Sequence, residues 1–305
     1  MSREIFFSFL IVMVAGSPNI ELELSFKTTL DEYPMAYSSA SFTISDDIIY
    51  VVNGANVGNA ILKFDLTGKY LGEYPGWFNF PHDVLIGGEK QAVVSALGAM
   101  GDDGMLRFGF VVYDSEGDFL HGLHQNQSGV LRPFGMTKMG EGNWFLAADW
   151  AGNLTYLMDI DWTDGTLKEK QELISVPWPD SLDISSDKIV VISFVCCQLE
   201  EFIKMTIYDL SGNLMKEVTH LPTGERILDP KDVAIDKMGN ILLSDSSLGV
   251  VVMSGDGSSL LATLPLPQPS PHKIIFYQEK LFTLVTREVE EDRVESFINV
   301  YKYSL

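Results

Sequence analysis

The chain has 305 residues, and its 42 Asp and Glu against 21 Lys and Arg give a formal net charge of −21. Such an acidic surface repels phosphate backbones, so nucleic acid is excluded as an expected partner. Only two cysteines occur, the adjacent Cys196 and Cys197, which excludes a disulfide-based scaffold and leaves the oxidation state of this pair open.

The first sixteen residues have the pattern of a targeting segment. Ile5–Ala15 is apolar except for Ser8, which is too short for a comfortable membrane span but suits a signal-peptide core, and small residues follow at Gly16-Ser17. We expect residues 1–16 to be a cleaved signal peptide and the protein to be secreted or extracytoplasmic. The alternative for this segment is a buried or interfacial apolar strand left over from a longer chain, and the alternative for the location is the cytoplasm. No second apolar segment is long enough to span a membrane.

Two glycosylation sequons, at Asn126 and Asn153, are consistent with export, although their use is left open.

After the targeting segment, Glu21–Lys27 alternates polar and apolar residues as an edge strand does. The chain ends with a similar stretch, Phe297–Tyr303, in a unit that is one strand short. We therefore expect the first segment to complete the last sheet by antiparallel pairing, which removes a free edge and ties the termini together.

Between these segments, a proline-marked unit recurs six times at intervals of 41 to 52 residues, beginning at Pro34, Pro81, Pro133, Pro179, Pro230 and Pro271. The fifth unit is the clearest, with strands expected at Asp232–Asp236, Asn240–Asp245, Gly249–Met253 and Ser259–Leu264. A fixed period of short strands and glycine turns is typical of a radial β array. The sequence predicts an all-β fold: one domain over residues 17–305, a six-bladed propeller of four-stranded blades.

The repeat resembles the NHL family of six-bladed propellers, most closely in the segment from Leu228-Asp-Pro-Lys-Asp to Gly255-Asp-Gly257. In that family a proline precedes a strand that ends in Asp, a Gly-Asn strand follows, and a third strand leads to Asp-x-x-Gly. The resemblance covers residues from about 34 to 303, but the third unit has a longer last turn at Asp161–Gly165 and the sixth lacks the Asp-x-x-Gly. It implies the fold and leaves the function open.

The residue after each marker proline is expected to lie in one ring at the start of the inner strands. That ring is Met35, His82, Phe134, Asp180, Lys231 and His272. Imidazole and carboxylate groups on alternate units, at His82, Asp180 and His272, suit a divalent cation such as zinc or calcium. This alternation resembles the peptidyl-hydroxyglycine amidating lyases, although Asp180 stands where that family would have a third histidine. The alternative is that these are polar residues lining a watery channel, where Asp83, Asp183 and Asp232 hydrogen-bond exposed backbone groups.

Aromatic residues gather in the loops at the same end of the expected channel, and the even-numbered units add long acidic loops. The candidate ligand-binding residues on this face are Trp77, Phe78, Asp83, Trp150, Trp178 and Lys231. Tryptophans in loops are typical of binding surfaces, although packing of the loops over the blade rims is the competing interpretation.

Two function classes follow. The first is a monomeric, non-catalytic binding or scaffold protein whose acidic, tryptophan-bearing loop face takes a protein, peptide or glycan. The second is a metal-dependent lyase or hydrolase with its site in the channel. The first is favoured, because no nucleophile elbow or phosphate-binding loop occurs.

Overall fold

The computed structural model describes residues 19–28, 39–54, 59–88, 90–130, 132–140, 142–193, 204–264, 266, 271–290 and 293–304. The expected signal segment 1–16, Met35 and the Cys196-Cys197 pair lie outside these residues. One of the long acidic loops expected in the even-numbered units, residues 199–201 of the fourth unit, also lies outside them.

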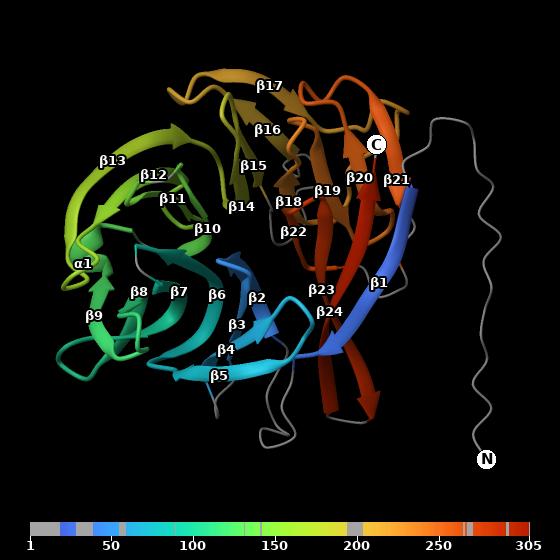
Figure 1. Ribbon diagram of the computed structural model, residues 1–305. Coiled ribbons are helices and arrows are strands. Elements are labelled where there is room, and N and C mark those ends of the chain that lie inside the picture. The colour runs from blue at the N-terminus through green and yellow to red at the C-terminus, as the bar shows by residue number, and fades with distance from the viewer. Residues whose placement is uncertain are drawn as a thin grey trace, which may run out of the picture.

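Six four-stranded antiparallel sheets stand around a central axis, as the sequence predicts (Figure 1). The first blade contains β2 (Ser39–Ser45), β3 (Ile48–Asn53), β4 (Ala60–Asp65) and β5 (Tyr70–Pro75), and the second contains β6 (Phe78–Gly87), β7 (Gln91–Met100), β8 (Leu106–Tyr113) and β9 (Phe119–His124). The third contains β10 (Pro133–Lys138), β11 (Trp144–Asp149), β12 (Leu154–Ile160) and β13 (Leu167–Ser175), and the fourth contains β14 (Pro179–Ile184), β15 (Ile189–Ser193), β16 (Lys204–Tyr208) and β17 (Leu214–Val218). The fifth contains β18 (Pro230–Ile235), β19 (Ile241–Asp245), β20 (Gly249–Met253) and β21 (Leu260–Leu264), and the sixth contains β22 (Lys273–Tyr277), β23 (Lys280–Glu290), β24 (Arg293–Ser304) and β1 (Asn19–Lys27). The first strand of each blade lies nearest the axis (Figure 1).

The ring closes as the sequence predicts, because β1 is the outer strand of the sixth blade. It pairs antiparallel with β24, from Asn19 opposite Ser304 to Lys27 opposite Phe297, with one irregularity between Leu22 and Leu24. The last sheet therefore contains both ends of the described chain.

Each pair of neighbouring blades shares its own hydrophobic core. Middle strands such as β15, β19 and β20 are buried along their whole length, because a neighbouring blade covers each face. Outer strands such as β5 and β17 keep most of their side chains in contact with solvent. The core between the sixth and first blades includes Phe42, Phe64 and Phe282, so closure buries apolar surface as well as backbone.

The Asp-x-x-Gly turns between third and fourth strands form as expected. At Asp65–Gly68 the aspartate side chain accepts the N–H groups of Thr67 and Lys69 at 2.8 and 2.9 Å, and Gly68 adopts φ 82°. Glycine is needed there because a left-handed backbone disfavours a Cβ atom.

The described chain contains one short helix, α1 (Gln125–Ser128). None of its helices is long and apolar enough to cross a membrane.

Candidate functional site

The marker prolines interrupt the hydrogen bonding between the first and second strands of their blades and so change the direction of the side chains that follow them. Proline has no N–H to donate, and in β6, β10, β14 and β18 the pairing register shifts directly after it. In β6, for example, Pro81 lies opposite Ala96, but Asp83 lies opposite Ser95. Such a bulge redirects the residues beside it, and the two positions after the proline therefore line one end of the channel. We call this end, where the first strands begin, the loop face.

Three channel aspartates link the inner strands of neighbouring blades. The carboxylates of Asp83, Asp183 and Asp232 each accept a backbone N–H of the next blade at 2.8 Å, from Met136, Ile235 and Ile274 respectively. Each also accepts a hydroxyl hydrogen from the preceding blade, from Ser41, Thr137 and Ser181 in the same order. The expectation that these aspartates serve backbone groups is therefore confirmed.

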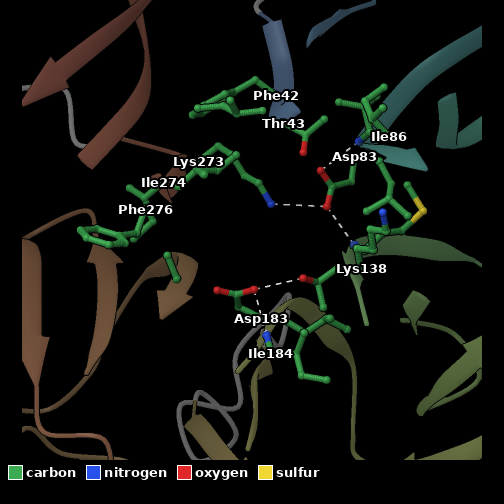
Figure 2. Close-up of a pocket in the computed structure, with 18 of the residues that line it drawn as sticks. Phe42, Thr43, Asp83, Ile86, Lys138, Asp183, Ile184, Lys273, Ile274 and Phe276 are labelled. Atoms are coloured by element: carbon green, nitrogen blue, oxygen red, sulfur yellow. Dashed lines mark hydrogen bonds and ion pairs between the residues drawn. The ribbon is translucent and has the colours of Figure 1, made fainter. Parts of the chain in front are cut away.

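Lys273 is the cation among these carboxylates, and Figure 2 shows its amino group pointing at Asp83 across the channel. Its Nζ lies 3.4 Å from Asp83 Oδ2 and 3.5 Å from Asp232 Oδ1, and the side chain is only 13 % exposed. Burial lowers the pKa of Lys273, but the carboxylates of Asp232, Asp83 and Asp183 outweigh that effect and raise it above its ordinary value. Lys273 therefore stays charged and bridges two blades.

One ammonium does not balance the carboxylates near it. Burial raises the pKa of Asp183 to about 6, and burial together with the charge of Asp232 raises that of Asp180 to about 6. Burial also raises the pKa of Asp232. The channel therefore takes up protons in mildly acidic solution.

A cavity of about 290 Å³ lies along the axis, and the inner strands of all six blades contribute to its lining. The side chains of Asp83, Asp183 and Lys273 point into it, and Lys138 and Phe276 line it further along their strands (Figure 2). It extends from the charged residues toward the turns between first and second strands. The bridges made by Lys273 therefore lie between this cavity and the loop face.

On the loop face, aromatic rings stack around an arginine. The His82 ring lies 3.8 Å from that of Phe134 at an interplanar angle of 21°, and Phe134 stacks on Trp150 at 6.1 Å. The guanidinium carbon of Arg132 lies 4.8 Å from the Trp150 ring centre and 5.3 Å from that of Phe134. We call these four residues, from two neighbouring blades, the aromatic–arginine cluster.

The cluster leaves two polar atoms without partners. Among the described residues, the buried Arg132 Nε and His82 Nε2 have no hydrogen-bond partner. Burial, with the charge of Arg132, lowers the pKa of His82 to about 4, so its imidazole is neutral at pH 7. Arg132 is therefore the one charged member of the cluster.

Two aromatic residues beside the cluster adopt a left-handed backbone. Phe80 and Trp178 directly precede marker prolines and have φ values of 49° and 44°. For bulky side chains this conformation costs of order 1–3 kcal/mol each and is concentrated at functional sites. Phe80 is 52 % exposed, and Trp178 donates its backbone N–H to the side-chain oxygen of Asn153 at 2.9 Å.

The predicted metal ligands do not come together. In the described part of the chain, no three His, Cys, Asp or Glu side chains are arranged to hold a metal ion. His82 is stacked against Phe134, and Asp180 lies in the field of Asp232, Lys231 and Lys273. The set of His82, Asp180 and His272 is therefore wrong as a preformed metal site, because the ring of His82 stacks on Phe134 and Asp180 lies among other charged side chains.

The predicted binding residues divide between the surface and the interior. Trp77 is 44 % exposed, and Trp150 and Trp178 are half-buried. Lys231 is half-buried and its Nζ lies 2.7 Å from Asp229. Phe78 was wrongly placed on the surface: it is 1 % exposed and packs edge-on against the Tyr113 ring. Asp83 is also buried, as a link between blades.

The sequence analysis did not single out two important side chains, although the position of each relative to its marker proline indicates a role. Lys273 stands two residues after its marker proline, where Asp83 and Asp232 stand in other units. Arg132 directly precedes Pro133, the position that Phe80 and Trp178 occupy in theirs. Comparing this pre-proline position across units singles out Arg132, Phe80 and Trp178.

No protein-family model matches the chain, and no curated protein matches it in sequence. Among solved structures, it is similar to a functionally unknown protein from Desulfotomaculum acetoxidans DSM 771, with a TM-score of 0.53 and 16% identity over 76% of this chain and 73% of that one. It is also similar to the computationally designed Ika8 protein, with a TM-score of 0.50 and 14% identity over 88% of this chain and 97% of that one. At such identities these likenesses concern the fold alone, and the chain is a six-bladed β-propeller.

Proposed function

We propose that this protein is a binding propeller that holds a protein, peptide or glycan ligand on its loop face, centred on the aromatic–arginine cluster. The observation that carries the proposal is the guanidinium of Arg132, which lies over Trp150 and Phe134 without an ion pair to any described residue. Tryptophan and arginine are the residues most enriched where binding energy concentrates. The strained backbones of Phe80 and Trp178 support a use beyond packing.

The exposed apolar residues of the second blade extend this surface. Trp77, Phe80, Leu106 and Phe108 are between 42 % and 52 % exposed, at the end of the blade where β6 begins and where β7 turns into β8. Apolar side chains that gather on one face mark interaction sites more often than scattered ones do. We also propose that the blades are of the NHL type, on the proline and Asp-x-x-Gly pattern of the fifth unit.

Peptide and glycan arrays probed with the purified protein test this function. We expect hits that Trp150→Ala weakens at least about tenfold, as loss of a central aromatic contact does. Trp144→Ala is the matched control, because Trp144 begins β11 at the opposite end of the blade and is also half-buried. The absence of hits, or hits that Trp144→Ala weakens and Trp150→Ala does not, would overturn the proposal.

We further propose that the protein is exported, with residues 1–16 as a cleaved signal. When the protein is expressed in a secreting host, we expect it to be found in the culture medium. N-terminal sequencing of that protein should give a first residue close to Ser17. Soluble protein that keeps Met1 or Ser2 contradicts export.

A further inference from the structure

We propose that the ligand of the loop face is a peptide segment with a carboxylate, which pairs edge-on with the guanidinium of Arg132. This inference rests on the proposed binding function and assigns the chemistry that the site selects.

The backbone holds Arg132 in place before any ligand arrives. Its N–H donates to Asp149 Oδ1 at 2.9 Å, and its carbonyl accepts the N–H of Trp150 at 3.0 Å. Asp149 is fully buried and also accepts the N–H of Gly152 at 3.0 Å. The strand entry and the loop that carries Trp150 are therefore fixed to each other, so little entropy is lost when the guanidinium is engaged.

The stacking leaves the hydrogen-bonding edge of Arg132 without a partner. Trp150 and Phe134 contact the guanidinium through their ring systems, at 4.8 and 5.3 Å. A guanidinium has five N–H donors in a planar fork that matches a carboxylate. The described residues provide the guanidinium of Arg132 with no acceptor, and its Nε is buried without a partner. A buried donor without a partner is costly, so the site gains when an acceptor arrives.

Arg107 shows what the chain does with an arginine that has only a surface role. It lies in β8 near the same face, and its guanidinium pairs through two nitrogens with Asp103, at 3.0 and 2.6 Å. Acidic residues outnumber basic ones two to one in this chain, 42 against 21. An arginine that has no carboxylate partner among the described residues of such a protein is therefore a site for a carboxylate that the ligand supplies.

The surroundings favour one carboxylate within an apolar peptide. His82 is neutral at pH 7, because its pKa is about 4, so the cluster offers a single positive charge. The net charge of −21 opposes phosphates and polyanions more strongly than one carboxylate. The exposed Trp77 and Phe80 lie toward the neighbouring second blade and suit apolar side chains of the same peptide.

A double-mutant cycle on peptides tests this inference. Hits from a random dodecapeptide array are resynthesised with each Asp or Glu changed to Asn or Gln, and with the terminal carboxylate amidated. Affinities are measured by fluorescence anisotropy against wild type, Arg132→Gln, Arg107→Gln and Trp150→Ala. We expect removal of one carboxylate to weaken wild-type binding about 10- to 100-fold, as for a charged hydrogen-bonded pair. Arg132→Gln should bind both peptides equally weakly, and Arg107→Gln should behave as wild type.

The outcomes separate this inference from the proposed function. Peptides that depend on Trp150 but bind equally with Glu or Gln leave the binding function standing and overturn the carboxylate. Tighter binding of a phosphoserine peptide than of its glutamate form also overturns it. Failure of every peptide to bind overturns the carboxylate peptide, and it counts against the binding function only if the glycan array gives no hits either. The amidated peptides decide whether the group is the chain terminus or a side chain.

Discussion

At the residue scale, adjacent positions after one proline serve different purposes. His82 and Asp83 follow Pro81, but the aspartate accepts hydrogen bonds from two other blades while the histidine stacks on Phe134 and leaves Nε2 without a partner. The bulge after the proline separates their directions. The unpaired Nε2 of His82 therefore lowers the stability of the fold, whereas the stacking of its ring on Phe134 raises it.

The variant His82→Phe keeps the ring and removes the titrating group. Burial lowers the folded-state pKa of His82 from 6.5 to about 4, so between these values the unfolded chain binds the proton more strongly. Wild-type stability is therefore lost as pH falls through this window. We expect His82→Phe to match or exceed wild type at pH 7, and to gain up to about 3 kcal/mol relative to it by pH 4.

Urea denaturation at pH 4, 5, 6 and 7 measures this difference. His220→Gln, at an exposed position, is the control and should follow the wild-type profile. Parallel profiles for His82→Phe and wild type would show that the imidazole is not buried as described.

The variant Lys273→Met tests the bridge between blades. It leaves the carboxylates of Asp83 and Asp232 buried without their shared ammonium, which costs about 3 kcal/mol at pH 8. The loss should shrink in acidic solution, because burial raises the pKa of Asp232 and the variant lacks the ammonium that opposes this rise, so that carboxylate is the first to take up a proton. Lys237→Met, which breaks an exposed pair with Glu279, should cost less than about 1 kcal/mol. Equal losses in denaturant titrations of the two variants would contradict a structural bridge.

The sequence predicted that Asp83, Asp183 and Asp232 lie in the channel and hydrogen-bond backbone groups, because a repeated pattern places equivalent segments at equivalent depth. It could not predict which side chains meet. The proposed triad of His82, Asp180 and His272 depended on directions that the bulges set, and the stacking partner of His82 belongs to another blade. Arg132 could not be singled out because an arginine in an acidic chain is ordinarily assigned to a surface ion pair, and only the structure shows that its guanidinium has no such pair with a described residue.

At the element scale, the third blade shows how an irregular turn is used. Its lengthened turn at Asp161–Gly165 carries Trp162, which is only 6 % exposed and packs in the core between the second and third blades. The ring reaches Gly87 at the end of β6, where a Cβ atom would lie 2.2 Å from a ring carbon. The departure from the repeat therefore fills the space beside a glycine of the preceding blade.

The variant Gly87→Ala should destabilise the protein by about 1–3 kcal/mol, because a packed indole ring has little freedom to move. Thermal denaturation followed by circular dichroism measures the change. Gly142→Ala is the matched control, because its nearest contact would be an ordinary 3.8 Å, and it should change stability little. A similar melting temperature for both variants would show that Trp162 yields easily.

At the scale of the whole molecule, the architecture could be predicted because it repeats. A short apolar segment alone does not distinguish a strand from a buried helix, but six copies of the same pattern do. The alternation of polar and apolar residues in Glu21–Lys27 indicates a strand with one covered face. The blade limits shifted by only a few residues, as in β18, which begins at Pro230 rather than Asp232. In the described part of the ring each blade shares a core with both of its neighbours, and β1 contributes Leu24 and Phe26 to the core between the sixth and first blades.

Removal of β1 is therefore the most direct test of closure. A chain beginning at residue 29 lacks the outer strand of the last blade, including Phe26, whose ring lies 5.6 Å from that of Phe64 in the first blade. We expect it to lose at least about 5 kcal/mol of stability relative to residues 17–305, or roughly 10 °C in melting temperature. A synthetic peptide of residues 17–28 should restore part of the loss in a concentration-dependent way, because it binds the folded ring and not the unfolded chain. The control Leu22→Asp changes a side chain of β1 that is 50 % exposed and should have little effect. If the shortened chain melts within one or two degrees of the parent, β1 does not hold the ring closed.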